Sequence, residues 1–105
     1  MLETNAYDTA CHEHLEYYGL AQVEWILDQV GMHVVGVELN DTNGGSFSVV
    51  AAHKQSSIKV NDVQLSAVRA KETLSAIGDL ATYEAFRLRV ENNRDQLRST
   101  LGEFK

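Results

Sequence analysis

The chain has 105 residues, with 15 Asp or Glu against 9 Lys or Arg, so its formal net charge is −6 at pH 7. This length allows one domain at most, or a piece of a larger one. The acidic balance argues against nucleic acid or an anionic membrane as the main partner, because both are bound through clustered Lys and Arg. The single cysteine cannot form an internal disulfide, which is typical of a protein in the reducing cytoplasm.

The first 18 residues are polar and aromatic and lack a clear periodicity, so we expect a loop or short irregular structure there. Within this loop, residues 11–18 (CHEHLEYY) bring together one thiol, two histidines, two carboxylates and two phenols. The chain has only four histidines in all, so this segment holds a large share of its reactive groups. It is the first candidate for a functional site.

Three interpretations of CHEHLEYY are open from the residues alone. A transition metal needs three or four ligands, such as Cys11, His12, His14 and a carboxylate, but the H-E-x-x-H spacing of zinc hydrolases is absent. A histidine beside a carboxylate can be tuned near neutral pH and remove a proton. In the third interpretation these side chains only cap the next helix and bind nearby backbone, and the pattern by itself favours this one.

Helical spacing of apolar residues over 20–30 predicts a helix of about three turns, with Gly31 at its C-terminal end. The run MHVVGVELN (32–40) is short and rich in β-branched residues, which is typical of a buried strand. Residues 40–45 (NDTNGG) have turn chemistry, and SFSVVAAH (46–53) predicts a second strand. We therefore expect an antiparallel hairpin.

Residues 58–78 predict a second helix, capped by Asn61 or Asp62 and ended by Gly78. We expect its core-facing stripe to consist of Val63, Ala67, Ala70, Leu74 and Ile77. Asp79 can cap a third helix that runs almost to the last residue. The apolar face of that helix consists of Tyr83, Phe86, Val90, Leu97, Leu101 and Phe104.

The predicted fold class is α/β: a helix, an antiparallel β-hairpin and then two helices. We divide a single partial domain (1–105) into a loop of the active-site type (1–18), a helix with a hairpin (19–54) and two helices (58–105). A sheet of two strands has two open edges and is marginal by itself. We therefore expect either the edge of a larger sheet, cut from a longer protein, or a homodimer through the strand edges or the terminal helix.

Two motifs, the H-E-H loop and the N-G-G-S turn, carry a family resemblance together with the strand between them. The first loop fits Y-D-x-x-x-H-E-H-x-x-Y-Y/F, residues 31–38 fit a G-hydrophobic-x-V-V-x-V-E strand, and residues 43–46 fit an N/H-G-G-S turn. The residues of the first motif are Tyr7, Asp8, His12, Glu13, His14, Tyr17 and Tyr18. With Tyr83-x-x-Phe86 in the last helix, nearly the whole chain resembles the S-adenosylmethionine-dependent sugar C-methyltransferases.

The resemblance implies the late part of a Rossmann-like methyltransferase domain, namely its last helix and two strands, followed by linker helices at the start of a C-terminal domain. It places the S-adenosylmethionine site on residues that this chain does not contain. It also places zinc only in an N-terminal module absent from this chain, so we assign no metal ligand here. We expect the 105 residues alone to lack methyltransferase activity and measurable affinity for S-adenosylmethionine.

The resemblance also implies a substrate and individual roles. The substrate would be a nucleotide-linked keto-sugar, which loses the proton α to its ketone before the resulting carbanion takes the methyl group. His14 matches the family base, and Glu13 matches the carboxylate that orients or tunes it. The positions implied to bind substrate are His12, Tyr17, Tyr18, Asn43, Gly44 and Gly45.

One position departs from the family pattern, because Cys11 stands where some relatives have tyrosine. If that phenol assists the reaction in relatives, Tyr17 or Tyr18 would have to take its part here. Two functions of other classes stay open beside the methyltransferase. One is a free-standing interaction or dimerisation module without catalysis, and the other is a small metal-binding protein that uses Cys11, His12 and His14.

Overall fold

A computed structural model describes residues 2–10, 13–42 and 45–104 of the chain. In chain order the elements are a short 3-10 helix η1 (Tyr7–Thr9), α1 (Leu20–Gln29), β1 (Met32–Asn40), β2 (Ser46–His53), α2 (Asp62–Leu74) and α3 (Leu80–Glu103). This order confirms the predicted α/β class with one helix, one antiparallel hairpin and two further helices. Within the described residues, no helix combines the length and the apolar character needed to cross a membrane.

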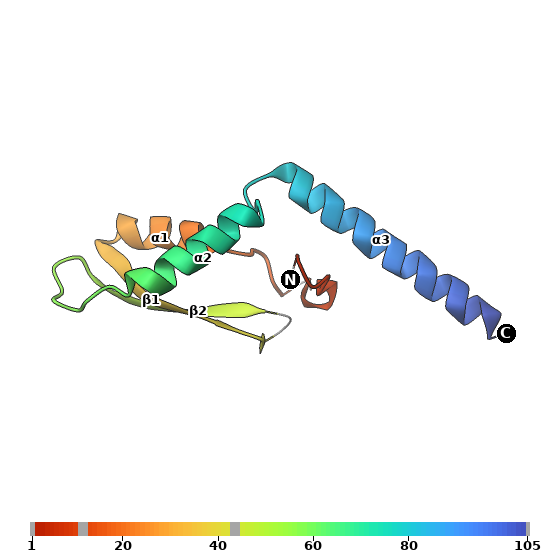
Figure 1. Ribbon diagram of the computed structural model, residues 1–105, viewed down its shortest axis with the longest axis horizontal. Coiled ribbons are helices and arrows are strands. Elements are labelled where there is room, and N and C mark those ends of the chain that lie inside the picture. Colours follow the sequence, from red (N-terminus) through yellow and green to blue (C-terminus); the bar gives the residue numbers. More distant parts are fainter. Residues whose placement is uncertain (1, 11–12, 43–44, 105) are drawn as a thin grey trace.

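The helices α1 and α2 both cover one face of the hairpin and form a two-layer body with it (Figure 1). The core between the layers consists of Leu20 from α1, Val34 and Val37 from β1, and Leu65 and Val68 from α2. Leu27, Phe47, Val49 and Val60 pack around this cluster. The core is small, so each of its members contributes a large share of the buried apolar surface.

A β-bulge explains how β1 places its valines. The strands pair from Met32 opposite His53 to Asn40 opposite Ser46, with an irregularity between Val34 and Gly36. Because side chains alternate along a strand, positions 34 and 37 would point to opposite faces of a regular strand. The extra residue in the bulge restores the phase, so that both Val34 and Val37 reach the core.

Helix α1 ends as the sequence predicted. Gly31 adopts a left-handed conformation with φ +72°, and a Cβ atom at this position would meet no atom within 4 Å. The backbone N–H of Gly31 donates to the Asp28 carbonyl oxygen at 3.2 Å, which satisfies a carbonyl group of the last helical turn. The glycine is therefore required by backbone conformation and not by lack of space.

We expect the substitution Gly31→Ala to lower the free energy of unfolding by about 1 kcal/mol, because alanine is strained in this conformation. Gly78→Ala is the matched control, since Gly78 also has open space around it but lacks the positive φ of Gly31. Urea denaturation of the three proteins measures the difference. Equal stability of the two variants would contradict the conformational role of Gly31.

Helix α2 confirms one prediction and corrects two. Asn61 is its N-cap, since its side chain accepts a hydrogen bond from the Gln64 N–H at 3.2 Å. The helix does not fill the predicted range 58–78, however, but runs only from Asp62 to Leu74. It begins late because Asn61 caps it, and it ends early because Ala76 takes a left-handed conformation with φ +46°.

The predicted core stripe of α2 was wrong. Val63 and Leu74 are 81% and 87% exposed, whereas Leu65 and Val68 are buried. The chain enters α2 beside β1, where the Asn61 N–H donates to the Val35 carbonyl oxygen at 2.8 Å. This tertiary contact fixes the rotation of the helix and selects the face that carries Leu65 and Val68.

Helix α3 extends away from the two-layer body, as Figure 1 shows. The molecule is therefore elongated, with dimensions of 65 × 24 × 23 Å and a radius of gyration of 17.7 Å, against about 13 Å for a compact domain of this size. Asp79 caps α3 as predicted, accepting from the Ala81 N–H at 3.0 Å. No described residue of α3 is buried, so its apolar face lies open along most of the helix.

Candidate functional site

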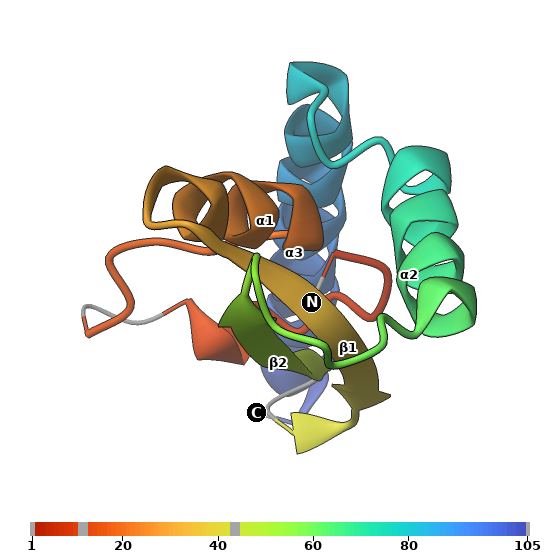
Figure 2. The same ribbon diagram turned by 90° about the vertical axis from the view of Figure 1, so that its left-hand side faces the viewer.

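The loop that carries the predicted base precedes α1. Its described part, residues 13–18, is an exposed coil that swings out from the body and then enters the helix at Leu20 (Figure 2). Cys11 and His12 lie outside the described residues. Glu13 and His14 are both exposed, so a ligand in solution can reach the imidazole.

The ring of His14 is in contact with the ring of Tyr17. Their centroids are 6.0 Å apart and the ring planes meet at 84°, which is an edge-to-face arrangement. Tyr17 is itself 53% exposed, so the contact restrains the imidazole without burying it. The next phenol, Tyr18, donates a hydrogen bond to the Glu16 carboxylate. The loop thus holds an accessible imidazole among aromatic side chains.

A shallow cavity adjoins the C-terminal end of this loop. It has a volume of about 500 Å³ and is lined by Tyr18, Ala21, Gln22, Trp25 and Ile26. Two of these side chains are aromatic and exposed, with 48% of Tyr18 and 66% of Trp25 accessible. Such faces offer planar apolar contact area next to polar groups, which suits a ligand with a ring. Trp25 was not among the predicted site residues.

The second predicted motif lies at the end of the hairpin. Asn43 and Gly44 lie outside the described residues, but Gly45 is described and has φ +114°. The Thr42 carbonyl oxygen accepts hydrogen bonds from the Gly45 N–H at 3.0 Å and from the Ser46 hydroxyl at 2.9 Å. The described part of this motif is therefore built as a tight turn, in agreement with its sequence.

The structure does not bring the described parts of the two motifs together. Figure 2 shows the loop of residues 13–18 at one side of the molecule and the hairpin end at another. Glu13, His14, Tyr17 and Tyr18 therefore form one group of predicted site residues, and Gly45 stands apart from them. The role of Gly45 in substrate binding stays a prediction.

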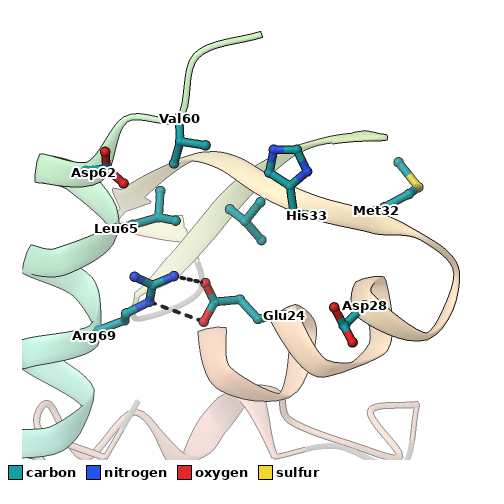
Figure 3. A pocket seen from close by; sticks show the side chains of 9 residues that line it. Glu24, Asp28, Met32, His33, Val60, Asp62, Leu65 and Arg69 are labelled. Carbon is teal, nitrogen blue, oxygen red and sulfur yellow. Dashed lines mark hydrogen bonds and ion pairs between the residues drawn. The ribbon is translucent and has the colours of Figure 1, made fainter. Parts of the chain in front are cut away.

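A second cavity, of about 270 Å³, lies between α1, β1 and the start of α2 (Figure 3). Its charged side chains include Glu24 and Arg69, which form a two-pronged ion pair. Hydrogen bonding to the Glu24 carboxylate raises the pKa of Arg69. In the part of the chain that the structure covers, no three His, Cys, Asp or Glu side chains are grouped to hold a metal ion. The ion pair between Glu24 and Arg69 at this cavity therefore connects α1 to α2.

Glu72 of α2 attaches the loop to that helix, although Glu72 belongs to no sequence motif. The carboxylate of Glu72 accepts a hydrogen bond from the Leu20 backbone N–H at 2.5 Å and another from the Ala21 N–H at 3.4 Å. Glu72 is 52 residues from Leu20 in the sequence. Local sequence patterns carry no signal for a contact at that separation.

Two comparisons with known proteins agree with each other. A family described as the C-methyltransferase C-terminal domain matches residues 41–105. The C-methyltransferase NovU from Streptomyces niveus is 33% identical to this chain over 98 residues. The aligned part covers 93% of this chain and 23% of that relative, so the chain spans about a quarter of the relative's length.

Proposed function

The chain belongs to the C-methyltransferase family, and from this premise we propose that it supplies the proton-abstracting part of an S-adenosylmethionine-dependent C-methyltransferase. We further propose that the acceptor is a nucleotide-linked keto-sugar, which rests on the H-E-H and N-G-G-S motifs. In this proposal, α1 and the hairpin are the end of a Rossmann-like domain, and the reaction takes place in the cytoplasm.

The chemistry of methyl transfer to carbon requires a base. Oxygen and nitrogen acceptors have a lone pair, whereas a carbon acceptor first has to lose a proton to become a nucleophile. A carbon beside a ketone is acidic enough for an imidazole, provided that the developing enolate oxygen is stabilised. The observation that carries the proposal is therefore the exposed imidazole of His14 in a member of a C-methyltransferase family.

The residues of the loop have distinct roles in the proposed reaction. His14 takes the proton from the carbon α to the ketone, and the electrons of the broken C–H bond form the enolate. Glu13 orients or tunes His14, and the Tyr17 ring restrains it at its edge. S-adenosylmethionine, when bound, would supply an electrophilic methyl group to the enolate carbon, and the electron pair of the broken C–S bond would remain on its sulfur. His14 then returns its proton to solvent, which completes the balance.

The substrate contacts follow from the cavity beside the loop. Tyr18 and Trp25 present exposed aromatic faces there, and Gln22 adds a polar group. We propose that this surface takes one ring of the nucleotide-linked sugar, so that the acidic carbon lies near His14. His12, Tyr17, Asn43, Gly44 and Gly45 keep their predicted roles as further substrate contacts.

Proton abstraction can be tested without methyl transfer. The protein expressed from the complete reading frame that encodes these residues is incubated in D₂O with a nucleotide-linked keto-sugar and no methyl donor. We expect deuterium to replace the proton α to the ketone, because the enolate that His14 forms is reprotonated by solvent. Loss of the proton NMR signal and a mass increase of about one unit per exchanged site measure this.

Two controls make this result decisive. The first is buffer without protein, which gives the background exchange of the ketone. The second is the corresponding sugar nucleotide with a hydroxyl group in place of the ketone, which has no acidic proton on carbon and should show no exchange at carbon. Exchange no faster than in buffer would overturn the proposed function, and so would equally fast exchange of carbon-bound protons in the control sugar.

A further inference from the structure

At the junction between the loop of residues 13–18 and α1, one local side chain takes part in capping, since Gln22 accepts a hydrogen bond from the Gly19 N–H at 3.0 Å. Gly19 is the N-cap residue and has no side-chain oxygen, although the first backbone N–H groups of any helix need acceptors. Glu72 on α2 fills this place from a distant part of the chain, through its contacts with Leu20 and Ala21. A carboxylate at a helix N-terminus also interacts favourably with the helix dipole.

The same junction is closely packed. A Cβ atom added to Gly19 would lie 2.5 Å from Cδ1 of Ile77, 2.8 Å from Oε1 of Gln22 and 3.0 Å from Oε1 of Glu72. Leu20, the next residue, is fully buried. The loop therefore leaves the body at a point that the end of α2 fixes closely, five residues after His14.

The N-terminal side of the same segment is also attached to the α2–α3 region. The Ser75 hydroxyl donates to the Glu3 carboxylate at 2.8 Å, and Lys71 lies 3.7 Å from that carboxylate. The hydrogen bond from Ser75, and then the charge of Lys71, lower the pKa of Glu3. Arg89 of α3 donates to the Asn5 side chain and to the Leu2 carbonyl oxygen, both at 2.8 Å.

We propose that Glu72 is a positioning residue for His14, with Arg89 and Ser75 holding the other end of the same segment. This inference rests on the proposed function of His14. A base on an exposed loop has to be held near its substrate carbon, because a displacement of about 1 Å can cost about 100-fold in rate. The end of α2 thus places the base, although it does not touch the reacting atoms.

The experiment compares Glu72→Ala, Glu72→Gln and Glu103→Ala. Glutamine retains a side-chain oxygen that can accept from Leu20, whereas alanine has no acceptor. Glu103 is the matched control, because it is an exposed glutamate at the far end of α3 (Figure 1). Residue-resolved hydrogen exchange reports the Leu20 and Ala21 amides, and the Val37 amide in β1 reports the core.

We expect Glu72→Ala to speed amide exchange at Leu20 and Ala21 about tenfold, as the loss of a helix cap predicts, while Val37 keeps its protection. The rate constant kcat for deuterium exchange into the keto-sugar should fall about tenfold or more, with a smaller change in KM, because the base is misplaced. Glu72→Gln should recover most of both losses, and Glu103→Ala should match the wild-type protein.

The outcomes separate this inference from the proposed function. If the wild-type protein exchanges the substrate proton but Glu72→Ala does so equally fast, only the role of Glu72 is overturned. If amide exchange rises equally at Leu20, Ala21 and Val37, Glu72 is a stabilising residue and not a positioning one. A wild-type protein without any substrate exchange overturns both proposals.

If Glu72→Ala does not fold, Gly19→Ala is tested instead, since its added Cβ disturbs the same junction while the Glu72 carboxylate is retained in the sequence. It should speed amide exchange at Leu20 and lower kcat without loss of the core. A Gly19→Ala protein with wild-type amide exchange and wild-type kcat would count against a positioning role for this junction.

Discussion

Replacing Leu65 by alanine is expected to lower the free energy of unfolding by about 2–5 kcal/mol, which is the usual range for a buried leucine. Leu65 is 2% exposed and belongs to the small cluster that joins α2 to β1 and α1. Folded domains are stable by only about 5–15 kcal/mol, so this single change can leave a large unfolded fraction. Urea denaturation followed by circular dichroism measures the loss.

Leu74→Ala is the matched control for this prediction. Leu74 lies on the same helix and is the same residue type, but 87% of its surface is exposed. Truncating this side chain creates no cavity inside the protein, so we expect the free energy of unfolding to change by no more than about 0.5 kcal/mol. A larger loss for Leu74→Ala than for Leu65→Ala would mean that α2 turns the face carrying Val63 and Leu74 toward the sheet, as the sequence pattern had suggested.

The elements that the sequence predicted well are those with local causes. Helix α1 has one apolar stripe and a glycine at its end, and Gly31 indeed takes the left-handed conformation there. The hairpin follows from two β-branched runs around a turn rich in Asn, Asp and Gly. Asn61 and Asp79 cap their helices through contacts of two or three residues, which a sequence pattern can express.

The predictions that were wrong, or were not made, depend on distant parts of the chain. Helix α2 offers two apolar faces, and the contact between Asn61 and Val35 selects the one with Leu65. The bulge in β1 likewise arises because valines three positions apart both have to reach the core. The sequence states which residues are apolar, but only packing decides which of them become buried.

Some residues of the candidate site could likewise be predicted from local sequence motifs, and others could not. His14 and Glu13 were found from a local motif, and the structure places both in an exposed loop. Glu72 carries no motif, because its contact with Leu20 spans 52 residues. Trp25 was not among the predicted site residues, but it lines a cavity beside the loop. A motif therefore identifies the reactive groups, whereas the residues that support them can be identified only once the fold is known.

Helix α3 is not packed against the two-layer body, so its stability has to come from other interactions. Its described residues are all at least partly exposed, and Arg87 forms ion pairs with Glu84 and Glu91 at helical spacing. Each exposed pair of this kind adds little stability, because both charges remain in contact with water. The apolar residues Leu97, Leu101 and Phe104 add no packing energy in this arrangement, since each is more than half exposed. The helix therefore depends on its cap, its local pairs and the contacts of Arg89 with the N-terminal segment.

The assignment of the base leads to the largest expected effect on activity. We expect His14→Ala to slow deuterium exchange into the keto-sugar, and methyl transfer with it, by about 10²–10⁴-fold, because a positioned base contributes about that much. The folded structure should persist, since His14 is exposed and lies outside the core. An unchanged urea midpoint would show that the loss is chemical and not structural.

Two other histidines test whether the effect belongs to His14. His33 lies on β1 and lines the charged cavity between α1 and α2 (Figure 3), and it is not part of the cavity beside the loop. His33→Ala should therefore keep the wild-type exchange rate.

His12 is two residues from His14 and is a predicted substrate contact. Its replacement by alanine should therefore raise KM more than it lowers kcat. If His12→Ala abolishes exchange while His14→Ala retains it, His12 is the base. If neither variant loses exchange, neither histidine of the loop is the base, because proton removal from carbon cannot proceed at that rate without one.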